Sequence, residues 1–314
     1  MNKYLEKIAF STVPHDFVRA KYREDSKSST DWRNMPDPVA SVKRDGAAFF
    51  LRVLPDGSPQ YLSRRESVRG GYPDRTEQLP HLSETKLPEF AGDVYHVELV
   101  HTGHTFKDGV PDSHPIVSGI LNSGVERAIS TQRVLGPVRA VMLDVISPKL
   151  GTYKEKLARM HEVSMAYGSP SVLHVVDTKI GRAEIEKLIK DTNSEGHEGV
   201  IITSLTAQEN SNVRIKVKHV DTYNLRVVGI TEEKDLLGNP KGSMGALIVV
   251  DGSGRIVANV GTGFSREDRI EIWKNRKDWE GKLIQVKAMP STSKRLRSPV
   301  YNGLADGNMD FIKQ

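Results

Sequence analysis

The sequence contains no cysteine. Disulfide bonds and cysteine-ligated zinc are therefore excluded as sources of stability. Ten histidines are present, but none stands in an HExxH-like spacing, so the sequence gives no indication of a structural metal. The stability of the chain must come from packing and hydrogen bonding.

Long apolar runs are also missing. The longest aliphatic run, Ala246–Val250, has about five residues, whereas ~20 are needed to cross a bilayer. The first residues carry lysine but lack the apolar segment of a secretory signal. We therefore expect a cytoplasmic protein without membrane contact, located in the host cytoplasm if the sequence is phage-encoded.

Aromatic residues are few, at 6%, while charged residues make up 27% and the net charge is +5. This composition is typical of a globular, hydrophilic chain. The modest basic excess permits a polyanionic partner, although an ordinary basic surface explains it equally well. The length of 314 residues is enough for about two domains.

The first 220 residues alternate between strand and helix patterns. A short helix is expected near Asp16–Arg23, and amphipathic helices at Tyr153–Tyr167 and Arg182–Asp191. Alternating or buried β-rich stretches indicate strands at the following positions: 40–53 with a turn at Asp45-Gly46, 60–63, 94–100, 138–146, 172–176, 199–203 and 213–217. The pattern predicts an α+β domain dominated by antiparallel sheet, over residues 1–220.

The pattern changes after residue 220. Short strands at Tyr223–Ile230, Gly245–Val250, Ile256–Val260 and Leu283–Ala288 are separated by Gly, Asn and Asp turns. One helix fits at Arg266–Lys274. About five strands with one helix between two of them favour a small OB-type β-barrel over residues 221–314.

The segment Lys43-Arg44-Asp45-Gly46 is the first candidate for chemistry. A lysine amine attacks phosphorus only when it is unprotonated, and nearby positive charge or desolvation favours that form. Gly46 would allow a tight turn and close approach to a nucleotide. A charged Asp-Gly hairpin turn is the plain alternative.

Further along the chain, acidic and basic residues stand in β-rich stretches: Arg64, Glu98 in VYHVELV, Asp144 in VMLDVI, Glu198 before GVII, and the pair Lys216 and Lys218. Each one alone is also explained as a surface residue. Together they form the set that a covalent nucleotidyltransferase requires. Carboxylates hold Mg²⁺ beside a triphosphate, lysines neutralise the α-phosphate, and an arginine grips ribose or phosphate.

In order and wording, these segments resemble the ATP-dependent DNA ligase family, in particular its small bacteriophage-type members with only a nucleotidyltransferase (adenylation) core and an OB-fold domain. The resemblance covers about residues 38–305. It extends to the second domain, where Gly242–Leu247 and Val260–Ser265 are similar to the OB region of these ligases.

The resemblance implies roles for individual residues. Lys43 matches the lysine that takes AMP as a phosphoramidate, and Asp45 the acidic residue of the same motif. The remaining matches are Arg64 with a ribose or nick contact, Glu98 with ribose or metal, Glu198 with metal, and Lys216 and Lys218 with phosphate. The implied cofactors are ATP, with AMP covalently bound to Lys43, and Mg²⁺.

Four positions depart from the family pattern. The sixth residue of K-x-D-G-x-R is Ala48, so a ribose contact is absent or supplied elsewhere. Leu143 replaces an adenine-stacking aromatic, which leaves aliphatic contacts to hold the base. Ser41 stands where Glu is frequent, and the C-terminal G-[LFW]-R-x-D motif reads Gly303-Leu304-Ala305-Asp306.

The expected donor is ATP rather than NAD, because only 42 residues precede Lys43 and the cysteines of a zinc finger are missing. The expected partner is nicked duplex DNA, bound by a monomer. Its phosphates would contact basic residues, for which the candidates are Arg64, Arg65, Lys294, Arg295 and Arg297. The stretch 294–297 is equally well explained as a solvated basic loop.

Three alternatives stay open. An RNA ligase would share Lys43 and most of the motifs. An mRNA-capping guanylyltransferase uses the same lysine chemistry with GTP. A catalytically impaired nucleic-acid-binding relative is favoured by Ala48 and Ala305.

Overall fold

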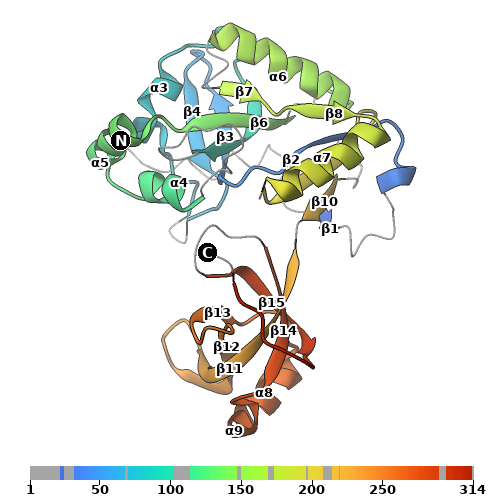
Figure 1. The fold of residues 1–314 in the computed structure, drawn as a ribbon. Coiled ribbons are helices and arrows are strands. Elements are labelled where there is room, and N and C mark those ends of the chain that lie inside the picture. The colour runs from blue at the N-terminus through green and yellow to red at the C-terminus, as the bar shows by residue number, and fades with distance from the viewer. Residues whose placement is uncertain are drawn as a thin grey trace. The chain divides into compact units, whose positions relative to one another are not determined.

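The computed structural model describes residues 32–67, 70–101, 114–146, 150–168, 173–195, 197–207, 214–218, 220–289 and 295–312, together with the backbone of 22–24. The chain divides into two compact units, Met1–Val217 and Lys218–Gln314. Each unit is described by itself (Figure 1). The fold class is α+β with mainly antiparallel sheets, as the sequence predicts.

The first unit contains a five-stranded sheet that we call the core sheet. In spatial order its strands are β4 (Pro59–Ser63), β3 (Ala47–Val53), β5 (Val94–Val100), β6 (Arg139–Ile146) and β7 (Leu173–Val175). All neighbours are antiparallel except β6 and β7. Because side chains alternate along a strand, one face carries the apolar residues of the main hydrophobic core.

Helices cover that apolar face. They are α3 (Pro80–Ser83), α4 (His114–Leu121), α5 (Val125–Leu135) and α6 (Tyr153–Tyr167). The first unit also contains three short 3₁₀ turns, η2 (Trp32–Asn34), η3 (Thr76–Gln78) and η4 (Pro88–Phe90). Helix α6 packs on β6 and β7 (Figure 1). The opposite face of the core sheet carries smaller apolar clusters, such as Phe50 with Leu62, together with the polar residues His96 and Glu98.

A second sheet of the first unit, the flanking sheet, runs β1 (Tyr22–Glu24), β10 (Arg214–Lys218), β9 (Gly199–Ser204), β2 (Pro38–Val42) and β8 (Thr178–Ile180). Helix α7 (Arg182–Ser194) packs on β2 and β9. Trp32, Met35 and Ile185 are buried in the small core of this sheet. The helix thus closes one face of the flanking sheet, as α6 closes one face of the core sheet.

The chain passes from one sheet to the other between β2 and β3. Strand β2 pairs with β8 and β9, whereas β3 pairs with β4 and β5, so Asp45-Gly46 is not a hairpin turn. The hairpin alternative for this segment is wrong, because the two strands have different partners. A β-carbon added at Gly46 would lie 2.0 Å from the carbonyl oxygen of Leu99, so only glycine fits at this crossing.

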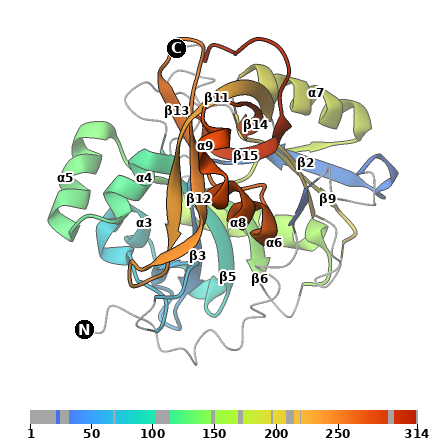
Figure 2. The ribbon, with the colours of Figure 1, turned by 90° about the horizontal axis from the view of Figure 1, so that it is seen from below.

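The second unit is a five-stranded antiparallel sheet in the order β13 (Ile256–Val260), β12 (Pro240–Val250), β11 (Asp221–Lys234), β14 (Leu283–Met289) and β15 (Arg297–Leu304). Helices α8 (Arg266–Lys274) and α9 (Arg276–Trp279) stand between β13 and β14 in sequence, and α8 lies along β12 (Figure 2). The five strands and the inserted helix agree with the predicted OB-type arrangement. Among the described residues, the two edges are joined by a parallel bridge between Thr262 and Val300 and by the Leu296 N–H, which donates to the Val257 carbonyl at 2.8 Å. These contacts do not form a continuous ladder, so the sheet is not a fully closed barrel.

Two expectations about elements need correction. Residues Tyr22–Glu24 form β1, parallel to β10, rather than the end of a helix, while residues 16–21 lie outside the described part. Helices α4 and α5 were not predicted from the sequence. Within the described residues, no helix is both long and apolar enough to cross a membrane.

Gly46→Ala is expected to destabilise the first unit by at least about 2 kcal/mol, since a methyl group must be accommodated against backbone rather than a movable side chain. The free energy of unfolding by chemical denaturation measures this. Gly119→Ala in α4 is the matched control: its added β-carbon meets nothing within 4 Å, and alanine should favour the helix by up to about 1 kcal/mol. Equal effects of the two substitutions would contradict the packing argument.

Candidate functional site

A pocket in the first unit is lined by strands of both sheets. The flanking sheet contributes residues from β2, β8, β9 and β10, and the core sheet residues from β3, β5 and β6. The lining residues are Val39, Ala40, Ser41, Val42, Lys43, Arg44, Ala48, Arg64, His96, Glu98, Leu143, Tyr153, Val176, Thr178, Ile201, Thr203, Arg214 and Lys216. The pocket therefore combines aliphatic walls with a high density of cationic side chains.

Lys43 lies directly after β2, at the start of the crossing between the sheets. Its backbone N–H donates to the Gly199 carbonyl at 2.8 Å, which holds the start of the crossing against β9. Its ammonium group donates to Glu198, and the side chains are only 20% and 8% exposed. The lysine is therefore fixed at both its backbone and its amine, although Glu198 stands 155 residues away in sequence.

Glu98 faces the same region from β5. Its carboxylate accepts a hydrogen bond of 3.2 Å from the Gly46 N–H. Burial raises the pKa of the Glu98 carboxyl to about 7, although Lys43 and the Gly46 N–H act in the opposite direction. Glu198 also contributes, because its negative charge raises the pKa of Glu98 further. The two glutamates and Lys43 thus form one electrostatically coupled group.

Arg64 follows β4 and approaches the pocket from the opposite edge of the core sheet. Its backbone N–H donates to the carbonyl of Ala48 at 3.3 Å. Its positive charge lowers the pKa of both Glu98 and His96. Burial, reinforced by Arg64, lowers the pKa of His96 to about 4, so that this imidazole is neutral in the folded protein at neutral pH.

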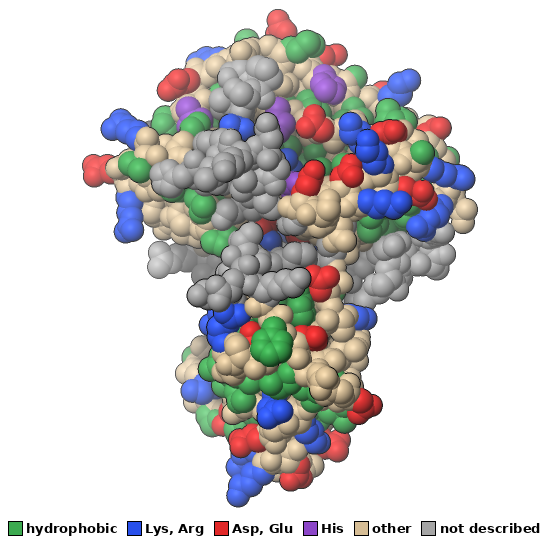
Figure 3. All heavy atoms as spheres, viewed as in Figure 1, with side chains coloured by type: hydrophobic (Ala, Val, Ile, Leu, Met, Phe, Trp, Pro, Cys, Tyr) green, Lys and Arg blue, Asp and Glu red, His purple; other side chains and the backbone are tan. Residues whose placement is uncertain are grey.

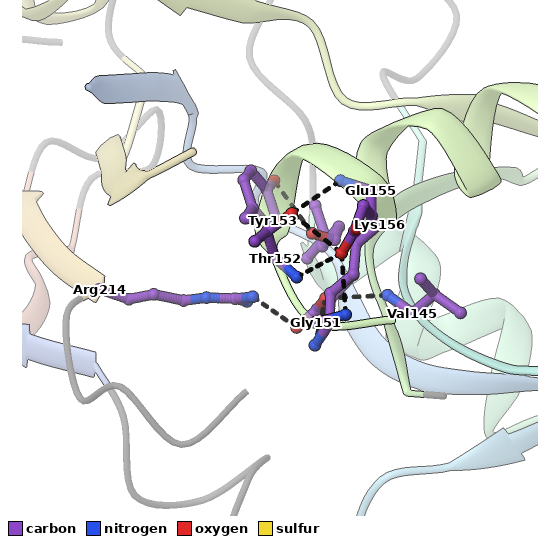
Figure 4. Close-up of polar contacts among 9 residues, drawn as sticks. Val145, Gly151, Thr152, Tyr153, Glu155, Lys156 and Arg214 are labelled. Carbon is purple, nitrogen blue, oxygen red and sulfur yellow. Dashed lines mark hydrogen bonds and ion pairs between the residues drawn. The ribbon is translucent and has the colours of Figure 1, made fainter. Parts of the chain in front are cut away.

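A buried carboxylate, Asp144, lies at the edge of the pocket and binds two cations. Arg214 on β10 donates to its Oδ2 at 2.5 Å, and the Lys156 ammonium lies 3.6 Å from its Oδ1. The exposed fractions of the Asp144 and Lys156 side chains are 1% and 3%. Figure 4 shows the Arg214 side chain extending toward the start of α6, where Lys156 stands. Asp144 thus holds two cationic side chains in place beside the pocket.

Helix α6 places two of these side chains. The helix begins at a capping box, in which Thr152 accepts from the Glu155 N–H and the Glu155 carboxylate accepts from the Thr152 N–H (Figure 4). Tyr153 and Lys156 then stand three residues apart on the inward face of the first turn. The Arg214 guanidinium lies 5.3 Å from the centre of the Tyr153 ring, and the Tyr153 hydroxyl donates to the Leu143 carbonyl at 3.3 Å.

The pocket brings together most of the residues that the sequence singled out in the first unit. Lys43, Arg64, Glu98, Leu143 and Lys216 line it, and Glu198 contacts Lys43. These side chains come from segments spread over more than half of the chain. Their convergence is a geometric finding, whereas the chemical role of each stays a prediction.

Other predicted residues lie elsewhere. Asp45 stands in the crossing but does not line the pocket, and Arg65 is exposed beyond β4. Lys218 ends β10 and belongs to the second unit, outside the pocket lining. Arg295 is exposed and Arg297 begins β15, so the stretch 294–297 is in part a strand, and Lys294 lies outside the described residues.

Sequence reasoning gave no site role to His96, Tyr153, Lys156 or Arg214, whereas it included Asp144 in the candidate set. Two of them could have been found by strand periodicity, because residues two apart share a face. Arg214 precedes Lys216 by two residues, and His96 precedes Glu98 by two residues. Lys156 gave a weaker signal, since a lysine within an amphipathic helix is expected to be solvated.

A preformed metal centre is not seen among the described residues, where no group of three or more His, Asp or Glu side chains converges. Glu98 and Glu198 nevertheless supply two carboxylates around Lys43. Mg²⁺ is usually held by one or two protein carboxylates together with substrate phosphates and water. The donor set therefore fits Mg²⁺ in company with a phosphate ligand.

The surface gives a less specific signal than the pocket. On the face shown in Figure 3, basic and acidic side chains are interspersed on each unit. The net charge of +5 is thus not gathered into one basic stripe on that face. The basic groups that indicate an anionic ligand most clearly are those inside the pocket.

Comparison with known proteins identifies the fold. No family model matches the sequence, and no curated protein matches it. Among solved structures, a Lig E DNA ligase, studied for DNA binding with a minimal scaffold, matches with a TM-score of 0.66 at 17% identity, covering 90% of this chain and 97% of that chain. Two structures of Pmar-Lig match with TM-scores of 0.64 and 0.63 at 17% and 14% identity.

In both Pmar-Lig comparisons, the matched region spans 90% of the present chain but only 66% of the Pmar-Lig chain. It covers nearly the whole length of the Lig E DNA ligase. The chain therefore has the fold of a small DNA ligase, in agreement with the resemblance seen in the sequence.

Glu98→Gln is expected to change how stability depends on pH in metal-free protein. The raised pKa means that folded Glu98 keeps its proton between pH 4.5, the ordinary value, and about 7, while the unfolded chain loses it. The free energy of unfolding of the wild type then falls as pH rises through this window. Glutamine is neutral throughout, so the variant should gain up to about 3 kcal/mol over the wild type by pH 8. Denaturation in EDTA from pH 5 to 8 measures this, and a gap that stays constant with pH contradicts it.

Proposed function

We propose that this protein is an ATP-dependent DNA ligase, which seals nicks between a 5′-phosphate and a 3′-hydroxyl through a lysine–AMP intermediate on Lys43. The observation that carries the proposal is the convergence of Lys43, Glu98, Glu198, Arg64 and Lys216 on one pocket. A DNA-ligase fold supports the same function but does not by itself assign an activity.

The first step joins Lys43 to the nucleotide. The amine nitrogen of Lys43 bonds to the α-phosphorus of ATP as the bond to the bridging oxygen breaks, and pyrophosphate leaves. The amine must first be released from its ion pair with Glu198 and lose a proton. In a phosphoryl transfer of this kind, the protein acts mainly by positioning the reactants in line and by neutralising charge.

Positive charge in the pocket would stabilise the phosphates. Lys216 and Arg64 line the pocket from opposite sheets, and Arg214, which is held by Asp144, lines it as well. Fixed cations in a partly desolvated site act more strongly than the same charges in water. Mg²⁺ held by Glu98 and Glu198 with the phosphate oxygens would neutralise additional charge on the triphosphate.

The nucleoside would occupy the apolar part of the pocket. Leu143, Val39, Val176 and Ile201 supply aliphatic walls from three strands and the segment after β7. Flat aliphatic contacts can hold a purine without a stacking aromatic ring, which agrees with leucine at position 143. Tyr153 also lines the pocket, but the Arg214 guanidinium lies over the face of its ring.

The later steps transfer AMP to the 5′-phosphate at a nick and then join the strands, as the 3′-hydroxyl attacks and AMP leaves. The second unit, as an OB-type domain, and the basic residues Arg65, Arg295 and Arg297 would contact DNA phosphates. The Lig E DNA ligase, whose fold this chain shares, was studied for DNA binding with a minimal scaffold, which supports a DNA partner for this chain.

Lys43→Ala is expected to abolish the covalent adduct, because no other amine stands at the crossing beside Glu198. Intact-protein mass spectrometry after incubation with ATP and Mg²⁺ should show one adenylyl group on the wild type and none on the variant. Lys187→Ala, at an exposed position of α7, is the matched control and should be labelled normally. An adduct that persists in Lys43→Ala shows that the nucleophile is another residue.

The same assay separates the alternatives. Labelling by GTP instead of ATP indicates a capping-type guanylyltransferase, and sealing of RNA-containing but not DNA nicks indicates an RNA ligase. A wild-type protein that takes neither nucleotide while binding DNA is a catalytically impaired relative, and the proposal is then wrong.

Lys216→Ala should lower the rate of adduct formation by about 10²–10³-fold, as expected for loss of one preorganised cation at a reacting phosphate. The melting temperature should change little, since this side chain is only half-buried at the pocket surface. Single-turnover labelling with Lys187→Ala as reference measures the rate. A loss of stability that matches a small loss of rate would assign Lys216 a structural role instead.

A further inference from the structure

One polar group of the pocket has no protein partner. His96 on β5 is 6% exposed, and its Nε2 atom is buried without a hydrogen bond from any described residue. Most buried polar atoms in folded proteins are paired, because an unpaired one loses its hydrogen bonds to water without replacement. A partner for this nitrogen is therefore to be sought outside the described side chains.

The position of His96 on its strand directs the imidazole to the pocket. Residues two apart on a strand share a face, and Glu98, two residues later, lines the same pocket. In the sheet register His96 stands between Phe50 on β3 and Asp144 on β6. The ring centroid of Phe50 lies 6.3 Å from that of His96, so aromatic packing limits the movement of the imidazole.

The charged neighbours of His96 are already engaged. The Asp144 carboxylate binds Arg214 and Lys156, and it accepts a further hydrogen bond of 2.9 Å from the Val145 N–H. The imidazole carries two ring nitrogens, which can serve as a hydrogen-bond donor and as an acceptor toward a ligand. A hydroxyl or a ring nitrogen of the ligand matches such a pair.

The spacing along β5 gives the part of the ligand that His96 would meet. Glu98 belongs to the group around the Lys43 amine, where the α-phosphate would react. His96 lies two residues from Glu98, which corresponds to about 7 Å along an extended strand. His96 also pairs with Asp144, which follows Leu143 of the proposed aliphatic wall, and this position favours the nucleoside over the reacting phosphate.

We propose that His96 is a nucleoside-binding residue, which forms a hydrogen bond through its imidazole with a sugar hydroxyl or a base-edge atom of the nucleotide held at Lys43. The inference rests on the proposed nucleotide-binding function of this pocket. It assigns recognition of the nucleoside to the His96 imidazole, in addition to the cations that would bind the phosphates.

Binding of two ligands tests the assignment. The first is an ATP analogue with a methylene group between the α- and β-phosphorus atoms, which cannot release pyrophosphate, and the second is inorganic tripolyphosphate. His96→Leu should weaken the analogue about fivefold by calorimetry, the loss expected for one neutral hydrogen bond, and leave tripolyphosphate unchanged. His96→Gln, whose amide can reach the position of Nε2, should restore most of the affinity for the analogue.

His174→Leu is the matched control, because this histidine stands on β7 outside the pocket lining and its loss should leave both affinities unchanged. A 2′-deoxy analogue locates the contact within the nucleoside: the leucine penalty disappears if His96 binds the 2′-hydroxyl and persists if it binds another nucleoside atom. Either result upholds the proposal.

The following results contradict the assignment of His96 to the nucleoside. Equal weakening of the analogue and of tripolyphosphate places His96 at the phosphates, and unchanged affinity in His96→Leu with a raised melting temperature shows a purely structural histidine. If the wild type takes AMP on Lys43 while all His96 variants bind the analogue alike, only this inference fails. If the wild type binds no nucleotide, the proposed function fails with it.

Discussion

The chain leaves the flanking sheet and enters the core sheet within the four residues between β2 and β3, and the pocket depends on how tightly this crossing is held. The Lys43 N–H is bound to Gly199 of one sheet, and the Gly46 N–H to Glu98 of the other. The close approach of Gly46 to the Leu99 carbonyl leaves no room for a side chain. The crossing therefore fixes the Lys43 amine between two sheets that have separate hydrophobic cores, and preorganisation of this kind is what a phosphoryl transfer requires.

The same crossing concentrates charge. Lys43 is paired with Glu198, whereas burial favours the protonated form of Glu98, so this group carries less negative charge than its residues suggest. Beside it, Asp144 binds the two cations Lys156 and Arg214. Buried charges are costly unless they are paired, so these ion pairs hold the cationic side chains in fixed positions. The proposed triphosphate would bind next to these fixed cations.

Much of this arrangement could be predicted from the sequence, and the missing parts have physical reasons. The helices at 153–167 and 266–274 were predicted with the observed bounds, and in the structure each begins at a capping box, at Thr152 and at Ser265. The crossing at Asp45-Gly46 was recognised as a turn, but the sequence could not show that its two strands join different sheets. Strand pairing is decided by partners 50 or more residues away, such as Glu98 opposite Ala48.

The buried group at Asp144 was harder to predict than the lysines of the pocket. Lys156 looks like one of many solvated lysines on a helix, and only the packing of α6 on β6 shows that it is buried. No sequence pattern indicates that the Nε2 of His96 is buried without a hydrogen bond from a described residue, because this depends on which side chains surround it in the fold. Local patterns thus predict elements and the residue types that a reaction needs, whereas burial and pairing are properties of the assembled fold.

The departures from the ligase pattern can be understood in the same terms. Ala48 lies opposite Glu98 in the sheet register and brings no charge, but Arg64 and Arg214 line the same pocket from other strands. Stabilisation of a phosphate depends on where positive charge stands relative to the phosphorus, and much less on which strand carries it. A pocket between two sheets allows such exchange, because side chains from both faces reach the same space. The pocket of this chain is therefore cationic although one of the arginines expected from the family pattern is absent.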